Sequence, residues 1–265
     1  MSRDRIASLI RQTLFGLYFA AFFLYLFVPL IIMGTAAFNA SRFPTIFPWT
    51  GTTLQWFGAL FQSQPMWQAL ATSFIVAVGV IVISLPVGTA AALVLTSLNA
   101  RARGVLYAVM VSPLLTPGVV IGISTLLLWR QFGVGGGVFL IVVAQSSFIA
   151  AYVMLIVSAR LQRFDRTQEE AALGLGASRA LIMRRVLLPY LKPALLAGGL
   201  LAFLQSFENY NTTLFVRGLD TPLTVYLASQ VRIGLTPAVN ALGLLLILAT
   251  VIGALTHEIV RRRRA

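Results

Sequence analysis

The sequence predicts an all-α membrane protein with six transmembrane helices. Of its 265 residues, 58% are hydrophobic and only 10% are charged, whereas soluble domains carry about 25% charged residues. Long stretches without any charge, such as residues 43–100, alternate with short arginine-rich segments. Such a chain lacks the polar surface of a water-soluble globule and is too hydrophobic to be intrinsically disordered, so the bilayer is its expected solvent.

Six stretches are apolar and long enough to cross the hydrocarbon core, which takes roughly 20 helical residues. Backbone polar groups in lipid must pair within the chain, so each stretch is expected to be helical. The expected spans are residues 13–38, 70–97, 105–129, 138–158, 194–215 and 237–256. The first span exceeds the apolar run of a signal peptide and is expected to be an uncleaved anchor. The whole chain, residues 1–265, is expected to form one transmembrane domain.

Two features modify these spans. Pro113 and Pro117 are expected to bend the third span, and Gly118 with Gly122 forms a Gly-x-x-x-Gly pair that suits either close packing or local flexibility. Residues 43–69 are charge-free but contain several prolines and aromatic residues. Because aromatic rings concentrate at membrane interfaces, this segment is expected to lie at the outer surface rather than to cross the membrane.

The basic residues predict the orientation. With the N terminus inside, 16 of the 20 basic residues fall on the cytoplasmic side and 4 fall outside. This bias follows the positive-inside rule and places both termini in the cytoplasm. The net charge of +13 is therefore ascribed to membrane topology and lipid contact rather than to nucleic-acid binding. The chain has no cysteine, which excludes disulfides and thiolate metal sites.

One cytoplasmic loop, residues 159–192, is longer than the others. Thr167 with Glu170 forms a capping-box pattern that predicts a helix start, and Gly174 and Gly176 are expected to end that helix. Ser178 is expected to cap a second helix, which Pro189 limits. The first helix is short and rich in alanine and glycine. The residues leave open whether it docks another protein or lies with its partner helix on the lipid surface.

The fifth span carries polar side chains that are rare in lipid. Glu208 is expected about 22 Å along this span from Pro193, somewhat beyond the middle of a core about 30 Å thick. A carboxylate there is costly unless it is paired or hydrated, so it is a candidate functional group. The nearby polar residues either line a pathway or hold helices together. The candidate pathway residues are Gln205, Glu208, Asn209, Asn211 and Thr212.

The long loop resembles the signature of permease subunits of binding-protein-dependent ABC importers. That signature is Glu-Ala-Ala, three residues, Gly, nine residues, then Ile-x-Leu-Pro. The chain departs from it at one position, where Val186 replaces isoleucine. The resemblance implies a type I ABC importer-like permease in the bacterial inner membrane, with a cytoplasmic coupling helix that docks on an ATPase. The residues implied in coupling are Glu170, Ala171, Ala172, Gly174, Gly176 and Pro189.

The resemblance also implies the partners. These are a homologous second permease subunit, two ATP-binding cassette ATPase subunits and an extracytoplasmic substrate-binding protein, with membrane lipid around the permeases. ATP and Mg are expected on the ATPase, because the single lysine, Lys192, does not lie in a phosphate-binding P-loop motif. No cofactor and no enzymatic activity are expected in this chain itself.

The outer segments, among them Thr53-Leu-Gln-Trp-Phe57 and Leu219–Tyr226, are similar to C-type permeases of spermidine/putrescine systems. A polyamine-like cation is therefore the first expected substrate. Ferric iron, amino-acid-like compounds and phosphonates are alternatives carried by related subfamilies. A self-contained channel or secondary transporter is the rival class, in which the long cytoplasmic loop would be expendable.

Overall fold

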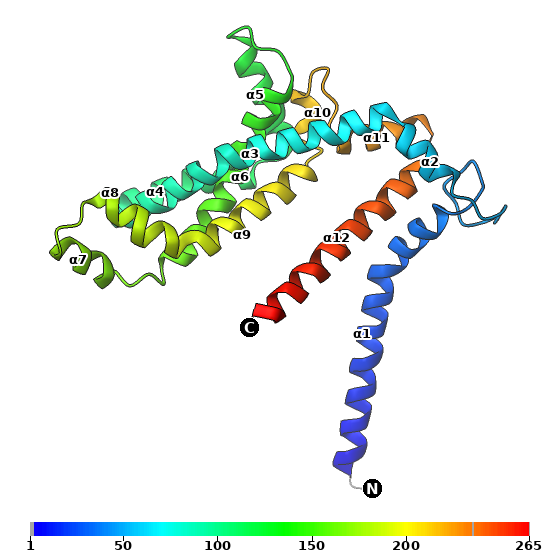
Figure 1. Ribbon diagram of the computed structural model, residues 1–265, viewed down its shortest axis with the longest axis horizontal. Coiled ribbons are helices and arrows are strands. Elements are labelled where there is room, and N and C mark those ends of the chain that lie inside the picture. The colour runs from blue at the N-terminus through cyan, green and yellow to red at the C-terminus, as the bar shows by residue number, and fades with distance from the viewer. Residues whose placement is uncertain (1–2, 235, 265) are drawn as a thin grey trace. The chain divides into compact units, whose positions relative to one another are not determined.

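The computed structural model describes residues 3–234 and 236–264, and within these ranges the chain is helical apart from loops and one isolated antiparallel bridge between Asn39 and Thr52. Figure 1 shows the order of the helices. The chain divides into two compact units, residues 1–64 with 229–265 and residues 65–228. The expectation of one domain over residues 1–265 stays a prediction.

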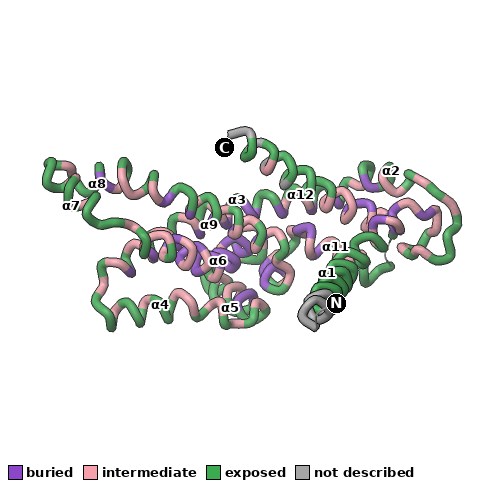
Figure 2. Tube along the Cα trace, turned by 90° about the horizontal axis from the view of Figure 1, so that it is seen from below, coloured by how far each residue is buried: buried purple, intermediate pink, exposed green. Residues whose placement is uncertain are grey.

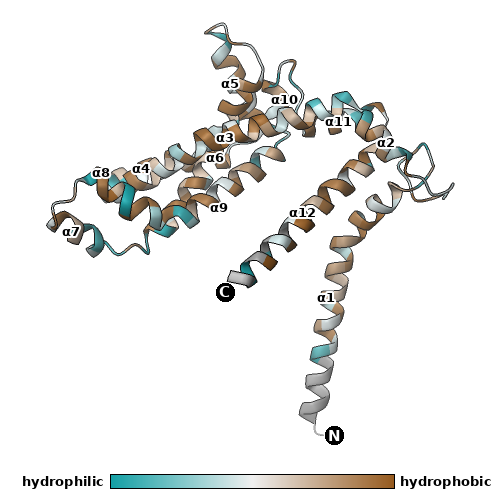
Figure 3. Cartoon of the chain, viewed as in Figure 1, coloured by the Kyte–Doolittle hydropathy of each residue, from teal (hydrophilic) through white to brown (hydrophobic). Residues whose placement is uncertain are grey.

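The first unit contains α1 (Arg3–Ala36), α2 (Gln55–Gln62) and α12 (Pro237–Arg264). Helix α12 packs against both α1 and α2. Close approach between α1 and α12 is possible because Gly243 has no side chain, and a Cβ there would lie 2.7 Å from Cε of Met33. Residues 11–32 of α1 are mostly apolar (Figure 3) and are all exposed, as expected of a helix that faces lipid.

The segment between α1 and α2 is organised by Asn39, which is fully buried. Its Nδ2 donates to the carbonyls of Thr45 and Pro48, at 2.9 and 3.1 Å, and its Oδ1 accepts from the backbone N–H and hydroxyl of Thr50. The indole N–H of Trp56 donates to the Asn39 carbonyl at 2.7 Å. The side-chain amide of Asn39 therefore provides hydrogen-bond partners for backbone groups of a loop that has little secondary structure of its own.

The second unit is built around α6 (Val138–Leu161), whose buried residues form most of the core, as the purple segment in Figure 2 shows. Helices α4 (Ala100–Leu115), α5 (Gly118–Arg130) and α9 (Leu188–Phe207) pack against it. Helix α3 (Gln64–Ser97) also approaches closely, because a Cβ on Gly88 would lie 2.5 Å from the carbonyl oxygen of Ala150. Such contact at backbone level is typical of membrane helices.

Four helical stretches are long and apolar enough to span a membrane within the described residues: 11–36, 64–97, 138–161 and 179–207. The pair α4 and α5 meets this test together but bends by 104°. The predicted bend of the third span is thus confirmed, and it falls at Thr116 and Pro117 between the two helices. The apolar part of α12, Pro237–Gly253, is shorter than these spans.

The fifth expected span, 194–215, differs from the structure at both ends. Pro189 does not end a helix, because it lies in the first turn of α9 and helical backbone continues from Arg179. A π-helical turn, Met183–Leu187, precedes it, and a wide turn accommodates the missing proline N–H. At the other end α9 stops at Phe207, and the short helix α10 (Thr213–Val216) follows after a non-helical stretch. Glu208 therefore caps a helix end rather than lying inside a helix.

Candidate substrate pocket and coupling loop

The long loop, residues 159–192, carries helix α7 (Thr167–Gly174), which has no buried residue. Helix α7 begins at Thr167, as predicted, but the predicted capping box does not form, because Arg166 is the N-cap residue and makes no side-chain capping hydrogen bond. Instead, Oδ1 of Asp165 accepts the backbone N–H of Thr167 at 3.0 Å. Hydrogen bonds from the backbone and then the hydroxyl of Thr167 hold the pKa of Asp165 below its ordinary value.

The end of α7 agrees with the sequence prediction. The helix stops at Gly174, and Gly176 has a φ of 81°, a left-handed conformation that suits glycine. Ser178 caps α8 (Arg179–Ile182), since its Oγ accepts the backbone N–H of Leu181 at 3.3 Å. Leu175, between the two glycines, is 89% exposed. Helix α7 and Leu175 are therefore accessible, as the docking predicted for this helix requires.

Most of the expected coupling residues are accessible for such docking. Ala172 is half-buried, and the others are exposed: Glu170, Ala171, Gly174, Gly176 and Pro189. Pro189 belongs to α9 and is separated from α7 by α8 and the π-helical turn. It is therefore placed to shape the returning helix rather than the docking helix itself.

The five expected pathway residues lie together at a pocket of about 320 Å³ in the second unit. The pocket forms where α9 breaks and where α4 bends into α5. Its lining contains one carboxylate and no lysine, arginine or histidine. The lining residues are Pro113, Leu114, Thr116, Gly118, Ile121, Phe148, Tyr152, Gln205, Glu208, Asn209, Tyr210, Asn211 and Thr212.

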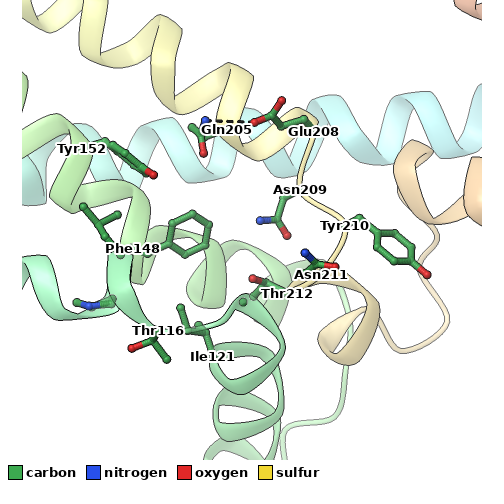
Figure 4. Close-up of a pocket in the computed structure, with 13 residues that line it drawn as sticks. Thr116, Ile121, Phe148, Tyr152, Gln205, Glu208, Asn209, Tyr210, Asn211 and Thr212 are labelled. Atoms are coloured by element: carbon green, nitrogen blue, oxygen red, sulfur yellow. Dashed lines mark hydrogen bonds between the residues drawn. The ribbon is translucent and has the colours of Figure 1, made fainter.

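Figure 4 shows how these side chains lie around the pocket. Glu208 is exposed, and its Oε1 accepts from Nε2 of Gln205 at 3.2 Å. The rings of Phe148 and Tyr152 come from α6 and face the broken segment across the pocket. A carboxylate beside aromatic rings attracts organic cations, through charge and through the faces of the rings.

The break in α9 is held by a buried polar chain that the sequence prediction missed. Gln145 on α6 is 1% exposed; its Oε1 accepts from Oγ of Ser206 at 2.6 Å and its Nε2 donates to Oγ1 of Thr213 at 2.8 Å. Thr213 in turn donates to Oδ1 of Asn209. The hydroxyl of Thr224 donates to the Asn209 carbonyl at 2.9 Å. The available clue was the only glutamine in this largely apolar span, followed directly by Ser146 and Ser147.

The glycine pair on α5 is confirmed as a packing site. A Cβ on Gly118 would lie 2.8 Å from Oγ1 of Thr212, and a Cβ on Gly122 would lie 2.7 Å from the Thr212 carbonyl oxygen. The pair contacts the broken segment and α10 rather than another long helix. Because neither glycine has a side chain, the backbone of α5 can approach the broken segment closely and form part of the pocket wall.

The chain is similar in sequence and in fold to known transport proteins. Residues 84–265 match the family model described as "Binding-protein-dependent transport system inner membrane component". The spermidine/putrescine transport system permease protein PotC of Escherichia coli (strain K12) is 31% identical over 261 residues, 96% of each chain. The putrescine transport system permease protein PotI of the same strain is 34% identical over 234 residues, 85% of this chain and 82% of PotI.

A solved structure shares the fold. It is a bacterial alginate ABC transporter in complex with an alginate pentasaccharide-bound periplasmic protein. The superposition has a TM-score of 0.70 at 15% identity and covers 98% of this chain and 96% of that one. The signature in the long loop, the helical membrane fold and the sequence relatives all indicate the same family. The chain is an ABC importer permease and belongs to the family of binding-protein-dependent transport system inner membrane components.

Proposed function

We propose that this permease forms half of the translocation pathway for a small organic amine, with polyamine-like cations as the first candidates. The observation that carries the proposal is the pocket at the break of α9, which is lined by Glu208 and aromatic rings and by no basic side chain. PotC and PotI, two relatives of this chain, are named for spermidine and putrescine transport. A homologous second permease would supply the other half of the pathway.

The energy would come from two partner ATPase subunits that bind ATP and Mg. Their docking site would be α7, with Glu170, Ala171, Ala172 and Gly176 as the contacts. Helix α6 ends at Leu161, just before this loop, and helical backbone returns from Arg179. Because α6 and α9 pack along each other and also hold the pocket, a push on α7 would reach the pocket through both helices.

The orientation follows the distribution of arginines. The loop that carries α7 would face the cytoplasm together with both termini. An extracytoplasmic binding protein would deliver the substrate from the opposite side and supply much of the selectivity. The alginate transporter of similar fold was solved with such a periplasmic protein.

The test is uptake of labelled putrescine and spermidine by the complete transporter in proteoliposomes. Glu208→Gln should raise KM about tenfold or more, because the substrate ammonium loses a charged hydrogen-bond partner. Glu258→Gln, which removes a carboxylate that is not part of the pocket, should leave KM unchanged.

Two other results would redirect the proposal. Normal KM in Glu208→Gln would remove the carboxylate from substrate binding and reopen the choice among ferric iron, amino-acid-like compounds and phosphonates. Uptake that continues without ATP or without the ATPase subunits would identify a self-contained channel or secondary transporter.

A further inference from the structure

We propose that Asn209 makes this pocket selective for an amine that carries one positive charge and a neutral hydrogen-bond acceptor, as an N-acylated diamine does. This inference rests on the proposed function and specifies its substrate class. It depends on the direction of the hydrogen bonds behind the pocket wall, which together fix which edge of the Asn209 amide faces the substrate.

The direction of the Asn209 amide is determined by a backbone group. The N–H of Thr213 can only donate, and it lies 3.2 Å from Oδ1 of Asn209. The hydroxyl of Thr213 donates to the same oxygen at 3.0 Å. Oδ1 therefore faces Thr213, and Nδ2 must occupy the other edge of the amide.

The polar chain behind Thr213 keeps its hydroxyl pointing this way. Nε2 of Gln145 donates to Oγ1 of Thr213, so the threonine proton is directed to Asn209. The Gln145 amide is fixed from the same side, because the Thr213 hydroxyl gives its proton to Asn209 and can only accept from Nε2 of Gln145. Oε1 of Gln145 then faces Ser206, whose Oγ donates to it at 2.6 Å. Gln145, Ser206 and Thr213 are all buried, and a reversed Asn209 amide would place its Nδ2 donors against the Thr213 N–H, which is also a donor. Gln145 thus acts as a positioning residue through Thr213.

The outward edge of the Asn209 amide faces the pocket. Figure 4 shows its nitrogen directed toward the side of the pocket where Phe148 and Gln205 lie. The pocket therefore presents N–H donors at Asn209 and the carboxylate of Glu208, the preceding residue in the chain. An ammonium group fits Glu208 and an acyl carbonyl fits Asn209, whereas a second ammonium would meet the amide N–H groups donor to donor.

The charge of the pocket favours the same ligand. Its lining holds a single carboxylate and no basic residue, so a substrate with one positive charge is neutralised there. A diamine or triamine brings further positive charges that this chain does not pair, and unpaired charge in a membrane protein is costly. N-acetylputrescine has one ammonium group and one carbonyl, and is a suitable probe beside spermidine.

The experiment compares uptake of N-acetylputrescine and of spermidine by the complete transporter in proteoliposomes. Asn209→Asp has nearly the same shape and keeps the oxygen that accepts from Thr213, but it replaces the N–H donors by a second negative charge. The ratio of N-acetylputrescine uptake to spermidine uptake should fall about tenfold. The binding protein is the same in every arm, so a changed ratio reports the permease.

Asn211→Asp is the matched control, because it adds the same charge to a residue that lines the same pocket and has no bond to the polar chain. It should lower the ratio through its added charge alone, and by less than Asn209→Asp at equal amounts of assembled transporter, because the N–H donors of Asn209 stay in place. An unchanged ratio in Asn209→Asp, or an equal change in Asn211→Asp, would overturn the inference while amine transport itself stands. If the unaltered transporter carries neither amine, the proposed function fails and this inference fails with it.

Discussion

Replacing Gly122 by alanine tests how the pocket wall is built. A Cβ at this position would lie 2.7 Å from the carbonyl oxygen of Thr212 and 3.3 Å from Cβ of Phe215. Ordinary van der Waals contact begins at 3.4 Å, and neither of these atoms belongs to the flexible end of a side chain. Helix α5 and the broken segment must therefore move apart, which costs about 1–3 kcal/mol for an overpacked site.

Part of this cost is offset, because alanine in a helix is favoured over glycine by up to about 1 kcal/mol. With the full offset the net loss is up to about 2 kcal/mol, which should lower the melting temperature of the detergent-purified protein by up to about 8 °C. Gly199→Ala on α9 is the control, since its Cβ would have no atom within 4 Å and the variant should melt at or above the unaltered protein. If Gly122→Ala melts as Gly199→Ala does, the close contact between α5 and Thr212 is refuted.

Three further outcomes are expected. Asp220→Ala removes the carboxylate oxygen that accepts the Val138 N–H at 2.8 Å at the start of α6; it should lower the free energy of unfolding by about 1 kcal/mol in thermal melts, and Asp220→Asn should restore most of it. Asn39→Ala should cost about 2–4 kcal/mol because several buried hydrogen bonds lose their partner, and limited proteolysis should then cleave residues 40–50 faster; unchanged cleavage would contradict this. The lowered pKa of Asp165 means that its bonds to Thr167 are intact above its ordinary value of 3.8 and are lost as the pH falls through the lowered value. Hydrogen exchange at the start of α7 should therefore show no pH-dependent loosening between pH 7 and about pH 4 but loosening below it, and Asp165→Asn should remove that dependence.

The charge-free stretches predicted the positions of the long helices well, because long apolar segments are stable in lipid and must be helical there. Their ends were less predictable. Pro65 belongs to the proline-containing segment 43–69 that was expected at the outer surface, yet it lies in the first turn of α3, where proline is tolerated. Pro189 is tolerated for a similar reason after a π-helical turn. A proline therefore predicts a helix end only when its position within the helical turn is also known.

The break at Glu208 could not be predicted from the local sequence. The residues on both sides are apolar, and the polar residues between them are compatible with a helix. What stabilises the open backbone is contributed from far along the chain, by Gln145 on α6 and by the hydroxyl of Thr224. The five residues were candidates for a pathway, with helix packing left open as the alternative, whereas the wall supplied by Tyr152 and Gly118 depends on the tertiary fold.

In the loop between α5 and α6, two adjacent glycines differ sharply in the space around them. A Cβ on Gly135 would meet nothing within 4 Å, whereas one on Gly136 would lie 2.6 Å from the backbone nitrogen of Gly218, itself at a φ of 59°. The chain has no native cysteine, so a thiol introduced at Gly135 would be unique. A spectroscopic label could therefore be attached at Gly135 as a reporter of transport cycles, while the same label at the next residue would force two loops apart.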